Sequence, residues 1–482
     1  MSWEPDISLP IDEYRIDDLD LITATADEKK DGRFNLIPYF QRLDLVESID
    51  SSFIQGTLRF SILKGEMKSR GVDLTMQDFL VITVSSIESL QNSSKAAELS
   101  EPRKIGGVFY ITDMVKKEVS DPKVDSYTLQ FSSSEVLNEY TRKISKSYKK
   151  QTRSDIVKKI TKDFLIKDTV QESKLGVFEQ TKDEFQCVIP KWSPMTSIDW
   201  LTKGCVSTEN NDSKCFSFFQ TFDDAEIPGE KPFAFNFRSL RTMFREKPTI
   251  GTDGNFLTGY ALLPYNTPLN EIQKRTLSRR TPLRCVMKNI SGLDKLFGGM
   301  YSSKLLSHDI TRKTFTEHQF EFDNTHVANE KTNRGLVVED NKVHKNFAKN
   351  FLKNGDAFIR MDNDHKNLFR KSETELGVNR TESWFQEYLN QKNVKNFITL
   401  EITLYGDTSR NVGETVMFTA PGAYEIDGDE LMSLELDQEG IDLAGKYLIT
   451  KVIHTFSMDD ENGSLGGKNI TKLTLVKDGW QL

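Results

Sequence analysis

The sequence predicts a β-dominated α+β fold, in which two antiparallel β-barrel domains are separated by an α/β insertion. Near the N-terminus, "QGTLRFSIL" (55–63) alternates apolar and polar residues with the period of two that is typical of half-buried strands. Near the C-terminus, "NFITLEITLYG" (396–406) alternates in the same way. Amphipathic helical patterns and proline-containing turns lie between these regions and indicate the insertion.

The pattern changes divide the chain into six segments. We predict an N-terminal arm (1–35), a first β-barrel (36–131), a helical or mixed domain (132–213), a β hairpin that contributes to the second barrel (214–244), a mixed polar insertion (245–395) and a second β-barrel (396–482).

The composition is that of an ordinary globular protein. The 482 residues include 28% charged and 10% aromatic residues, which excludes a disordered or fibrous chain. No apolar run approaches the roughly 20 residues of a membrane span, and the N-terminus is acidic where a signal peptide is basic and then apolar. We therefore expect synthesis and folding in a cytoplasm, and no contact with a membrane.

The four cysteines are spaced too widely for a Cys-x-x-Cys motif, which favours buried free thiols over a disulfide framework or a zinc site. They are Cys187, Cys205, Cys215 and Cys285.

A basic stretch follows the first β region. Nine Lys or Arg residues lie between Arg142 and Lys162, against the single acid Asp155. Ser132 and Glu135 have the spacing of a helix start, and so do Thr152 and Asp155, so two helices are predicted, with a break over 149–152. The first helix would bury Val136, Leu137, Tyr140 and Ile144.

Two interpretations of this positive charge remain open. Clustered lysines are typical of a nucleic-acid contact, because they displace counterions from phosphates. In the second helix, however, Lys158, Lys159 and Lys162 lie opposite an apolar face, as on an ordinary solvated helix. The second interpretation is favoured, because the chain has a formal net charge of −8. The apolar face comprises Ile156, Val157, Ile160, Phe164 and Leu165.

The following segments alternate between turns and strands. Pro190 and Pro194 exclude a helix through their turn, and a helix is predicted over 197–205 with Ile198 and Leu201 facing inward. The phenylalanine-rich segment 214–244 predicts a hairpin with an acidic loop, "DDAEIPGE". In the polar insertion, only "FQEYLNQKN" (385–393) and the stretch around 293–306 resemble helices.

The usual catalytic motifs are incomplete. Gly467 and Lys468 resemble the end of a phosphate-binding loop, but Asn469 replaces the required Ser or Thr, and Asn462 replaces the first glycine. There is no Gly-x-Ser-x-Gly or His-Glu-x-x-His motif. We therefore predict a protein that is not an enzyme and assign no catalytic or cofactor-binding residue.

The candidate metal ligands are equally incomplete. "MDNDHKN" groups Asp362, Asp364 and His365, but it lacks the glycine and the distal glutamate of a calcium loop. His308, His318 and His326 are eight to ten residues apart, too far for a local ligand set. His454 lies in an alternating strand, where it is expected to face a core or a subunit contact. No metal site is predicted.

Several ordered motifs resemble the baseplate hub proteins of contractile-tailed phages, the T-even-type hub family. The similar segments span about 38 to 480, with the exception of 245–395. They are "PYFQRLDLVESIDSSFIQGTLRFSI" (38–62), "YTLQFSSSEVLNEYTRKISKSYKKQTRSDIVKKI" (127–160), "VIPKWSPMTSIDWL" (188–201), "FNFRSL" (235–240), "GKYLITKVIHTFS" (445–457) and "TKLTLVKDG" (471–479).

This resemblance implies an architecture and a set of partners. The two β domains would be tail-tube-like barrels, and a homotrimer would arrange six of them in a ring that joins a hexameric tail tube to a trimeric central spike. The partners would be the tail tube or tube-initiator protein, the central spike protein, inner baseplate or wedge proteins and the tape measure protein, with DNA only in transit through the channel. The protein would be part of the virion, in the tail baseplate, after assembly in the host cytoplasm.

Two alternatives remain. The first is the hub component of a related contractile injection or secretion system. The second is a tail-associated enzyme that degrades the cell wall, with its activity in 245–395.

Overall fold

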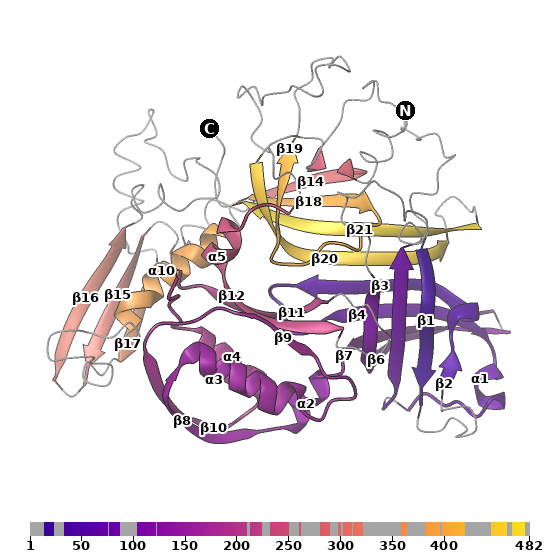
Figure 1. Cartoon of the computed structure of the whole chain (residues 1–482), viewed down its shortest axis with the longest axis horizontal. Helices are drawn as coiled ribbons and strands as arrows, with labels where there is room; N and C mark the ends of the chain where they lie inside the picture. The colour runs from indigo at the N-terminus through magenta and orange to yellow at the C-terminus, as the bar shows by residue number, and fades with distance from the viewer. Residues whose placement is uncertain are drawn as a thin grey trace, which may run out of the picture.

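The computed structural model describes most of the β regions and the helical domain, and parts of the polar insertion. The described residues are 14–23, 33–75, 77–86, 104–121, 123–209, 213–223, 232–249, 260–261, 280–289, 297–299, 302–310, 312–321, 358–363, 381–395, 398–419, 445–459 and 465–477. The fold is β-dominated, with large antiparallel sheets, as the sequence predicts (Figure 1).

Seven strands form the N-terminal part of the largest sheet. In β4, Gly56, Leu58, Phe60 and Ile62 are buried while the residues between them are exposed or half-buried, so the predicted alternation is confirmed. A 3-10 turn (Ile37–Tyr39) and the short helix α1 (Glu66–Ser69) lie between strands. The strands are β1 (Tyr14–Ile22), β2 (Arg33–Asn35), β3 (Phe40–Ser48), β4 (Gln55–Leu63), β5 (Phe79–Ser86), β6 (Ile105–Asp121) and β7 (Val124–Ser133).

The C-terminal strands belong to the same sheet. The strand predicted within 396–406 is confirmed, and the strand that contains His454 is confirmed as well. The C-terminal strands are β18 (Ile398–Tyr405), β19 (Thr415–Thr419), β20 (Gly445–Asp459) and β21 (Leu465–Lys477), joined by β13 (Tyr260–Ala261) and β14 (Arg284–Asn289).

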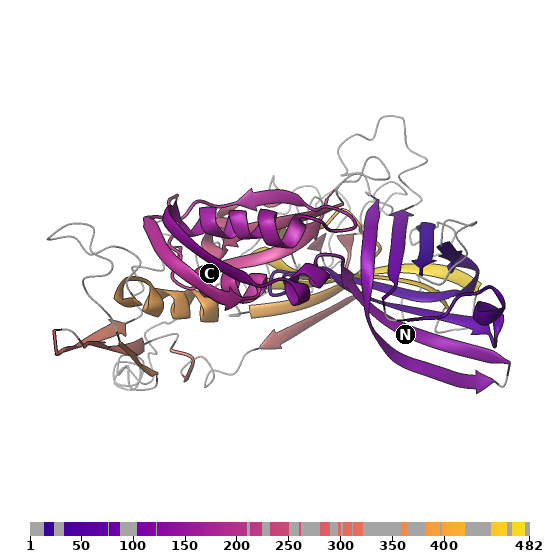
Figure 2. The ribbon, with the colours of Figure 1, turned by 90° about the horizontal axis from the view of Figure 1, so that it is seen from below.

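The long strand β20 connects the two β regions. It pairs with β21 on one side and with β3 on the other, in a register that places Lys451 opposite Ser48 and Ser457 opposite Arg42. Thr455 Oγ1 also donates to Asp44 Oδ1 across this joint, at 2.6 Å. The N-terminal and C-terminal halves therefore form one sheet, visible as adjacent indigo and yellow strands in Figures 1 and 2.

No closed barrel is found among the described residues, where the two predicted barrel domains share one sheet. There the main path of the 13-stranded sheet runs β14-β18-β21-β20-β3-β4-β7-β6-β5-β1-β2 and ends at β14 and β2. Strand alternation shows which residues are buried but does not identify the neighbouring strand, so the joining of the two β regions was not predicted. The predicted arm (1–35) is corrected as well, because β1 pairs with β5 along its whole length.

The helical domain contains more β structure than predicted. It comprises α2 (Val136–Thr141), β8 (Ile144–Thr152), α3 (Arg153–Ile160), a π-helical turn η4 (Thr161–Ile166), β9 (Lys174–Phe178), β10 (Glu184–Trp192) and α4 (Pro194–Thr202). Figure 1 shows the β8–β10 ribbon curving around α3 and α4.

The first of the two predicted helices is mostly wrong. Helix α2 is short, its N-cap residue Glu135 forms no side-chain cap, and Tyr140 is exposed. Ile144 is buried as predicted, but it lies in strand β8. Ile144 and Tyr148 are four residues apart, a spacing that also fits one face of a helix, so the pattern did not distinguish the two structures.

The helix at the proline turn begins earlier than predicted. Helix α4 begins at Pro194 rather than at Ser197, because proline is well accommodated in the first turn of a helix. Ser193 caps it by accepting a hydrogen bond from the Thr196 amide at 3.3 Å. Ile198 and Leu201 are fully buried, as predicted.

The phenylalanine-rich hairpin does not join the second β region as predicted. Its strands β11 (Phe216–Phe222) and β12 (Phe233–Ser239) form a separate three-stranded sheet with β9, followed by helix α5 (Leu240–Arg245). All seven residues of β12 are buried, so both faces of the hairpin are covered. The predicted acidic loop lies outside the described residues, apart from Asp223.

The hairpin contributes to all three hydrophobic cores that the described residues form. Phe222 and Phe233 pack in the N-terminal β core, and Phe219 packs in the C-terminal β core. On the third side, four rings pack in the core of the helical domain. Those rings are Phe216, Phe218, Phe235 and Phe237.

A buried polar group lies at the same junction. Glu135 is fully buried and accepts a hydrogen bond from Ser173 Oγ, while Gln220 Nε2 donates to Ser173 Oγ at 3.1 Å. Gln220 Oε1 in turn accepts from the Ile54 amide at 3.1 Å. This chain links the helical domain, the hairpin and the N-terminal β region, and burial raises the pKa of Glu135 above its ordinary value.

The polar insertion contributes a small outlying unit. Strands β15 (Ser302–Asp309), β16 (Thr314–Glu321) and β17 (Ile359–Asn363) form a sheet that packs against helix α10 (Thr381–Val394). The predicted helix over 385–393 is confirmed. The helix predicted around 293–306 is wrong for 302–306, which lie in β15, and 293–296 lie outside the described residues.

We predict that Phe235→Ala destabilises the protein by about 3–5 kcal/mol, because the buried ring stacks on Phe218 at 5.3 Å and a cavity would remain. Urea unfolding measures the loss. The control Val188→Ala, at a side chain that is 69% exposed, should cost less than about 0.5 kcal/mol. A cost below about 1.5 kcal/mol for Phe235→Ala would contradict the packing described here.

We also predict a pH dependence that originates at Glu135. Because its folded pKa is raised, the wild type loses stability as the pH rises from the unfolded pKa, about 4.3, through the folded pKa. Glu135→Gln cannot titrate, so it should gain stability relative to the wild type over this range, with a slope of at most about 1.4 kcal/mol per pH unit.

Urea unfolding at a series of pH values tests this expectation. Glu209→Gln, at an exposed position, is the control and should follow the wild type. A stability difference between Glu135→Gln and the wild type that does not change with pH would exclude this role for Glu135.

Candidate protein interface along helix α3

The basic stretch 142–162 continues from α2 through β8 and α3, and most of its cationic side chains are exposed. Arg153 is the exception that the sequence did not indicate. Its guanidinium donates to the carbonyls of Leu201 and Lys203, at 3.2 and 2.8 Å, and lies 3.8 Å from the centre of the Phe185 ring. Burial lowers the pKa of Arg153, whose role is to connect α3 with the end of α4.

The predicted second helix is confirmed as α3. Thr152 Oγ1 accepts a hydrogen bond from the Asp155 amide at 3.2 Å, so the predicted cap is present. The apolar face is buried, apart from the half-buried Phe164, whereas Lys158, Lys159 and Lys162 are exposed. This arrangement matches the interpretation as a solvated helix face, but it leaves several positive charges on one side of the domain.

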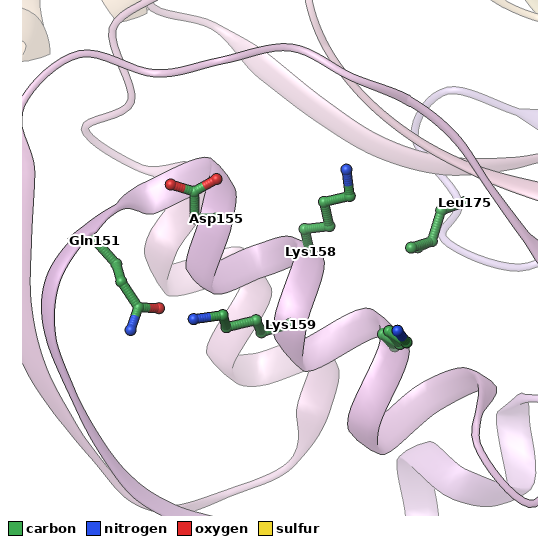
Figure 3. A pocket seen from close by; sticks show the side chains of 6 residues that line it. Gln151, Asp155, Lys158, Lys159 and Leu175 are labelled. Carbon is green, nitrogen blue, oxygen red and sulfur yellow. The ribbon is translucent and has the colours of Figure 1, made fainter.

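A shallow groove runs beside these lysines. One cavity, of about 300 Å³, lies between the helix and β9, and Figure 3 shows its side chains. An adjoining cavity, of about 470 Å³, shares Lys162 and Leu175 with the first. We call the two together the α3 groove. It is lined by Gln151, Asp155, Lys158, Lys159, Lys162, Asp163, Ile166, Lys167, Glu172, Ser173, Lys174 and Leu175.

The α3 groove combines charged and apolar side chains that can contact a partner protein. Five of its side chains are lysines and three are carboxylates, and Leu175 and Ile166 add apolar surface. Lys174 Nζ lies 2.8 Å from Asp223 Oδ2, so part of the positive charge is already neutralised. The lysines on α3 remain exposed and face the groove, where they can contact a negatively charged partner.

The predicted metal-ligand candidates are not brought together among the described residues. His308 lies on the open face of the β15–β17 sheet, and His318 lies on the face that α10 covers, where its Nε2 is 3.2 Å from Glu382 Oε1. Asp362 lies in β17. His326, Asp364 and His365 lie outside the described residues. Across the described part of the chain, no three His, Cys, Asp or Glu side chains group closely enough to hold a metal ion.

His454 is fully buried in β20, facing a core as its strand pattern predicts. Its Nδ1 is 3.3 Å from Thr471 Oγ1, which also accepts a hydrogen bond from the Asp407 amide at 2.9 Å. Burial opposes ionisation of Asp407 and is the largest single effect, but Arg410, the hydrogen bonds from Ser409, and His454 together outweigh it, so the pKa of Asp407 falls below its ordinary value. The cluster is a buried ion-pair network that fixes the loop after β18. Gly467, Lys468 and Asn469 lie in strand β21 rather than in a phosphate-binding loop.

No helix in the described segments is long and apolar enough to cross a membrane.

The chain was compared with protein families, curated proteins and solved structures. No protein-family model matches the chain, and no curated protein matches it. The chain is similar to solved structures of phage tail and secretion-system proteins. A 43 kDa tail protein of prophage MuSo2 from Shewanella oneidensis is 10% identical, with a TM-score of 0.46, over 96% of this chain and 98% of that chain.

Two further structures show comparable similarity. A tail protein from Neisseria meningitidis is 9% identical, with a TM-score of 0.49, over 97% of each chain. An Escherichia coli component of the type VI secretion system, described as similar to bacteriophage T4 tail proteins, is 10% identical, with a TM-score of 0.41, over 98% of this chain and 79% of that chain.

The cysteines are free, as predicted, and their thiols yield a testable expectation. Burial raises the pKa of Cys205 and of Cys215 to about 12, so at pH 8 neither should form the reactive thiolate. Iodoacetamide labelling followed by peptide mass spectrometry should modify the half-buried Cys285 first, and Cys205 and Cys215 only after unfolding. Labelling of Cys205 in the native protein as fast as that of Cys285 would contradict this order.

Proposed function

We propose that the protein is a structural baseplate hub of a contractile phage tail. In this role a homotrimer joins the hexameric tail tube to the trimeric central spike and leaves a channel for genome passage. The partners are the tube or tube-initiator protein, the spike, inner baseplate or wedge proteins and the tape measure protein. DNA passes through the channel without being a specific ligand, and the protein functions in the virion after assembly in the host cytoplasm.

The proposal rests mainly on where the motifs that resemble the hub family lie in the structure. Several of them form the strands that join the two β regions and part of the hairpin that all three cores share. The first motif forms β3 and β4, and the last two form β20 and β21, so both partners of the β3–β20 joint lie within the resemblance. The "FNFRSL" motif covers residues 235–239 of the fully buried strand β12 and the first residue of α5, at the junction of the three cores.

The internal arrangement of the chain supports the threefold assembly. The N-terminal and C-terminal strands have separate hydrophobic cores within one sheet, so each copy supplies two β units. Three copies around an axis would supply six, which is the number needed to match a hexameric tube to a trimeric spike.

The exposed lysines of α3 support a protein interface rather than a nucleic-acid grip. Carboxylates are interspersed among them, with Asp163 Oδ2 3.8 Å from Lys146 Nζ, and these would repel a phosphate chain. In a hub, charges of this kind set the register and the choice of neighbouring subunits.

Solution mass is the test of the proposal. Light scattering on the purified protein, alone and with its spike protein, should give a trimer in at least one condition, three times 55.2 kDa or about 166 kDa per hub. A strict monomer in both conditions would overturn the threefold role. Zymography on isolated cell walls should give no clearing, and a cleared zone would instead favour the cell-wall-degrading alternative.

A further inference from the structure

We infer that the α3 groove binds an extended, acidic segment of a partner protein, which adds a strand to the edge of β9 that pairs with no strand in the described part of the chain. The inference goes beyond the proposed hub role, because that role names no partner for this face. It depends on the position of β9, on the lysines opposite it and on the chemistry between them.

Strand β9 is the edge strand of its sheet. In the order β11-β12-β9, its paired strand within the described residues is β12, in parallel. On that inner side, Asn236 Oδ1 accepts a hydrogen bond from the Val177 amide at 3.0 Å. A side chain in place of Gly176 would come within 2.5 Å of the same oxygen, so the glycine permits this close contact. Lys174 and Leu175 of β9 line the α3 groove.

The opposite wall of the groove is cationic. Lys158 and Lys162 project from α3 and η4 beside Leu175 of β9, and Figure 3 shows Leu175 directed across the gap toward the helix. Lys158 Nζ also lies 6.0 Å from the centre of the Phe178 ring, so this lysine spans from the helix to the end of β9. A carboxylate on an added strand would meet these ammonium groups.

Besides the lysines, apolar surface on β9 is the second feature that a partner segment would contact. Leu175 is half-buried on the lysine side, where it packs with Phe178 against the core of the helical domain, whereas Val177 is 55% exposed. The register of β9 on β12 shifts between Leu175 and Phe178, so Val177, next to Phe178, lies on the opposite face. An added strand with alternating side chains can place carboxylates on the lysine side and apolar groups beside Val177 while its backbone pairs with β9. The partner that fits is therefore a segment that alternates acidic and apolar residues.

The same features disfavour nucleic acid. Asp155, Asp163 and Glu172 also line the groove, where they would repel a continuous phosphate backbone. A peptide can avoid them by the spacing of its own carboxylates, and it alone can hydrogen-bond to a strand edge.

The experiment uses the full chain and a fluorescent peptide of alternating sequence, Glu-Val-Glu-Thr-Glu-Val-Glu-Thr-Glu, at 150 mM salt. Fluorescence anisotropy should detect binding, and the double variant Lys158→Glu/Lys162→Glu should weaken it at least tenfold. The matched control Lys64→Glu/Lys68→Glu makes the same charge change at exposed lysines beside and within α1, and it should bind like the wild type.

A second peptide separates strand addition from simple charge attraction. The same sequence with alternate backbone nitrogens methylated keeps every carboxylate but loses donors for a strand edge, and it should bind at least tenfold more weakly. Equal binding of both peptides, or equal weakening by the control variant, would overturn the inference. Tighter binding of a single-stranded oligonucleotide than of the peptide would overturn it in favour of a nucleic-acid site.

Discussion

The burial of both faces of the β11–β12 hairpin is the constraint on which the rest of the structure depends. A hairpin at the surface exposes one face, but every residue of Phe233–Ser239 is buried. Its rings can be covered only if the N-terminal β region, the C-terminal β region and the helical domain all pack around it. Glu135 and Gln220 add a polar link at the same place, which requires the surrounding amide and hydroxyl donors to be in position.

The sequence predicted local structure better than it predicted which elements are neighbours. Alternation located β4 and β18, because each buries one set of alternate side chains, and the Thr152 cap located the start of α3. The pairing of β3 with β20 joins residues some 400 positions apart, and no local pattern encodes such a partner. Strand β8 was predicted as a helix, because its two buried side chains have helical spacing. The polar residues between and after them, several of them lysines, leave no alternation of apolar and polar side chains that would indicate a strand.

The candidate interface was predictable only in part. The solvent-exposed lysines of α3 follow directly from its amphipathic pattern. The groove does not, because its other wall is β9, a five-residue strand whose position depends on long-range pairing with β12. The burial of Arg153 was equally invisible, since its partners are carbonyls at the end of α4. The proposed hub role would use this combination of a rigid centre and a charged periphery, because subunit contacts are then held in a fixed orientation.

Hydrogen exchange of the native protein in low concentrations of denaturant shows whether the hairpin joins the three cores into one cooperative unit. If it does, the slowest amides of β4, β12 and β20 exchange through the same opening, with free energies and denaturant dependences that converge. Exchange of β4 or β20 through a separate opening of much lower free energy, while β12 stays protected, would show instead that the cores are independent.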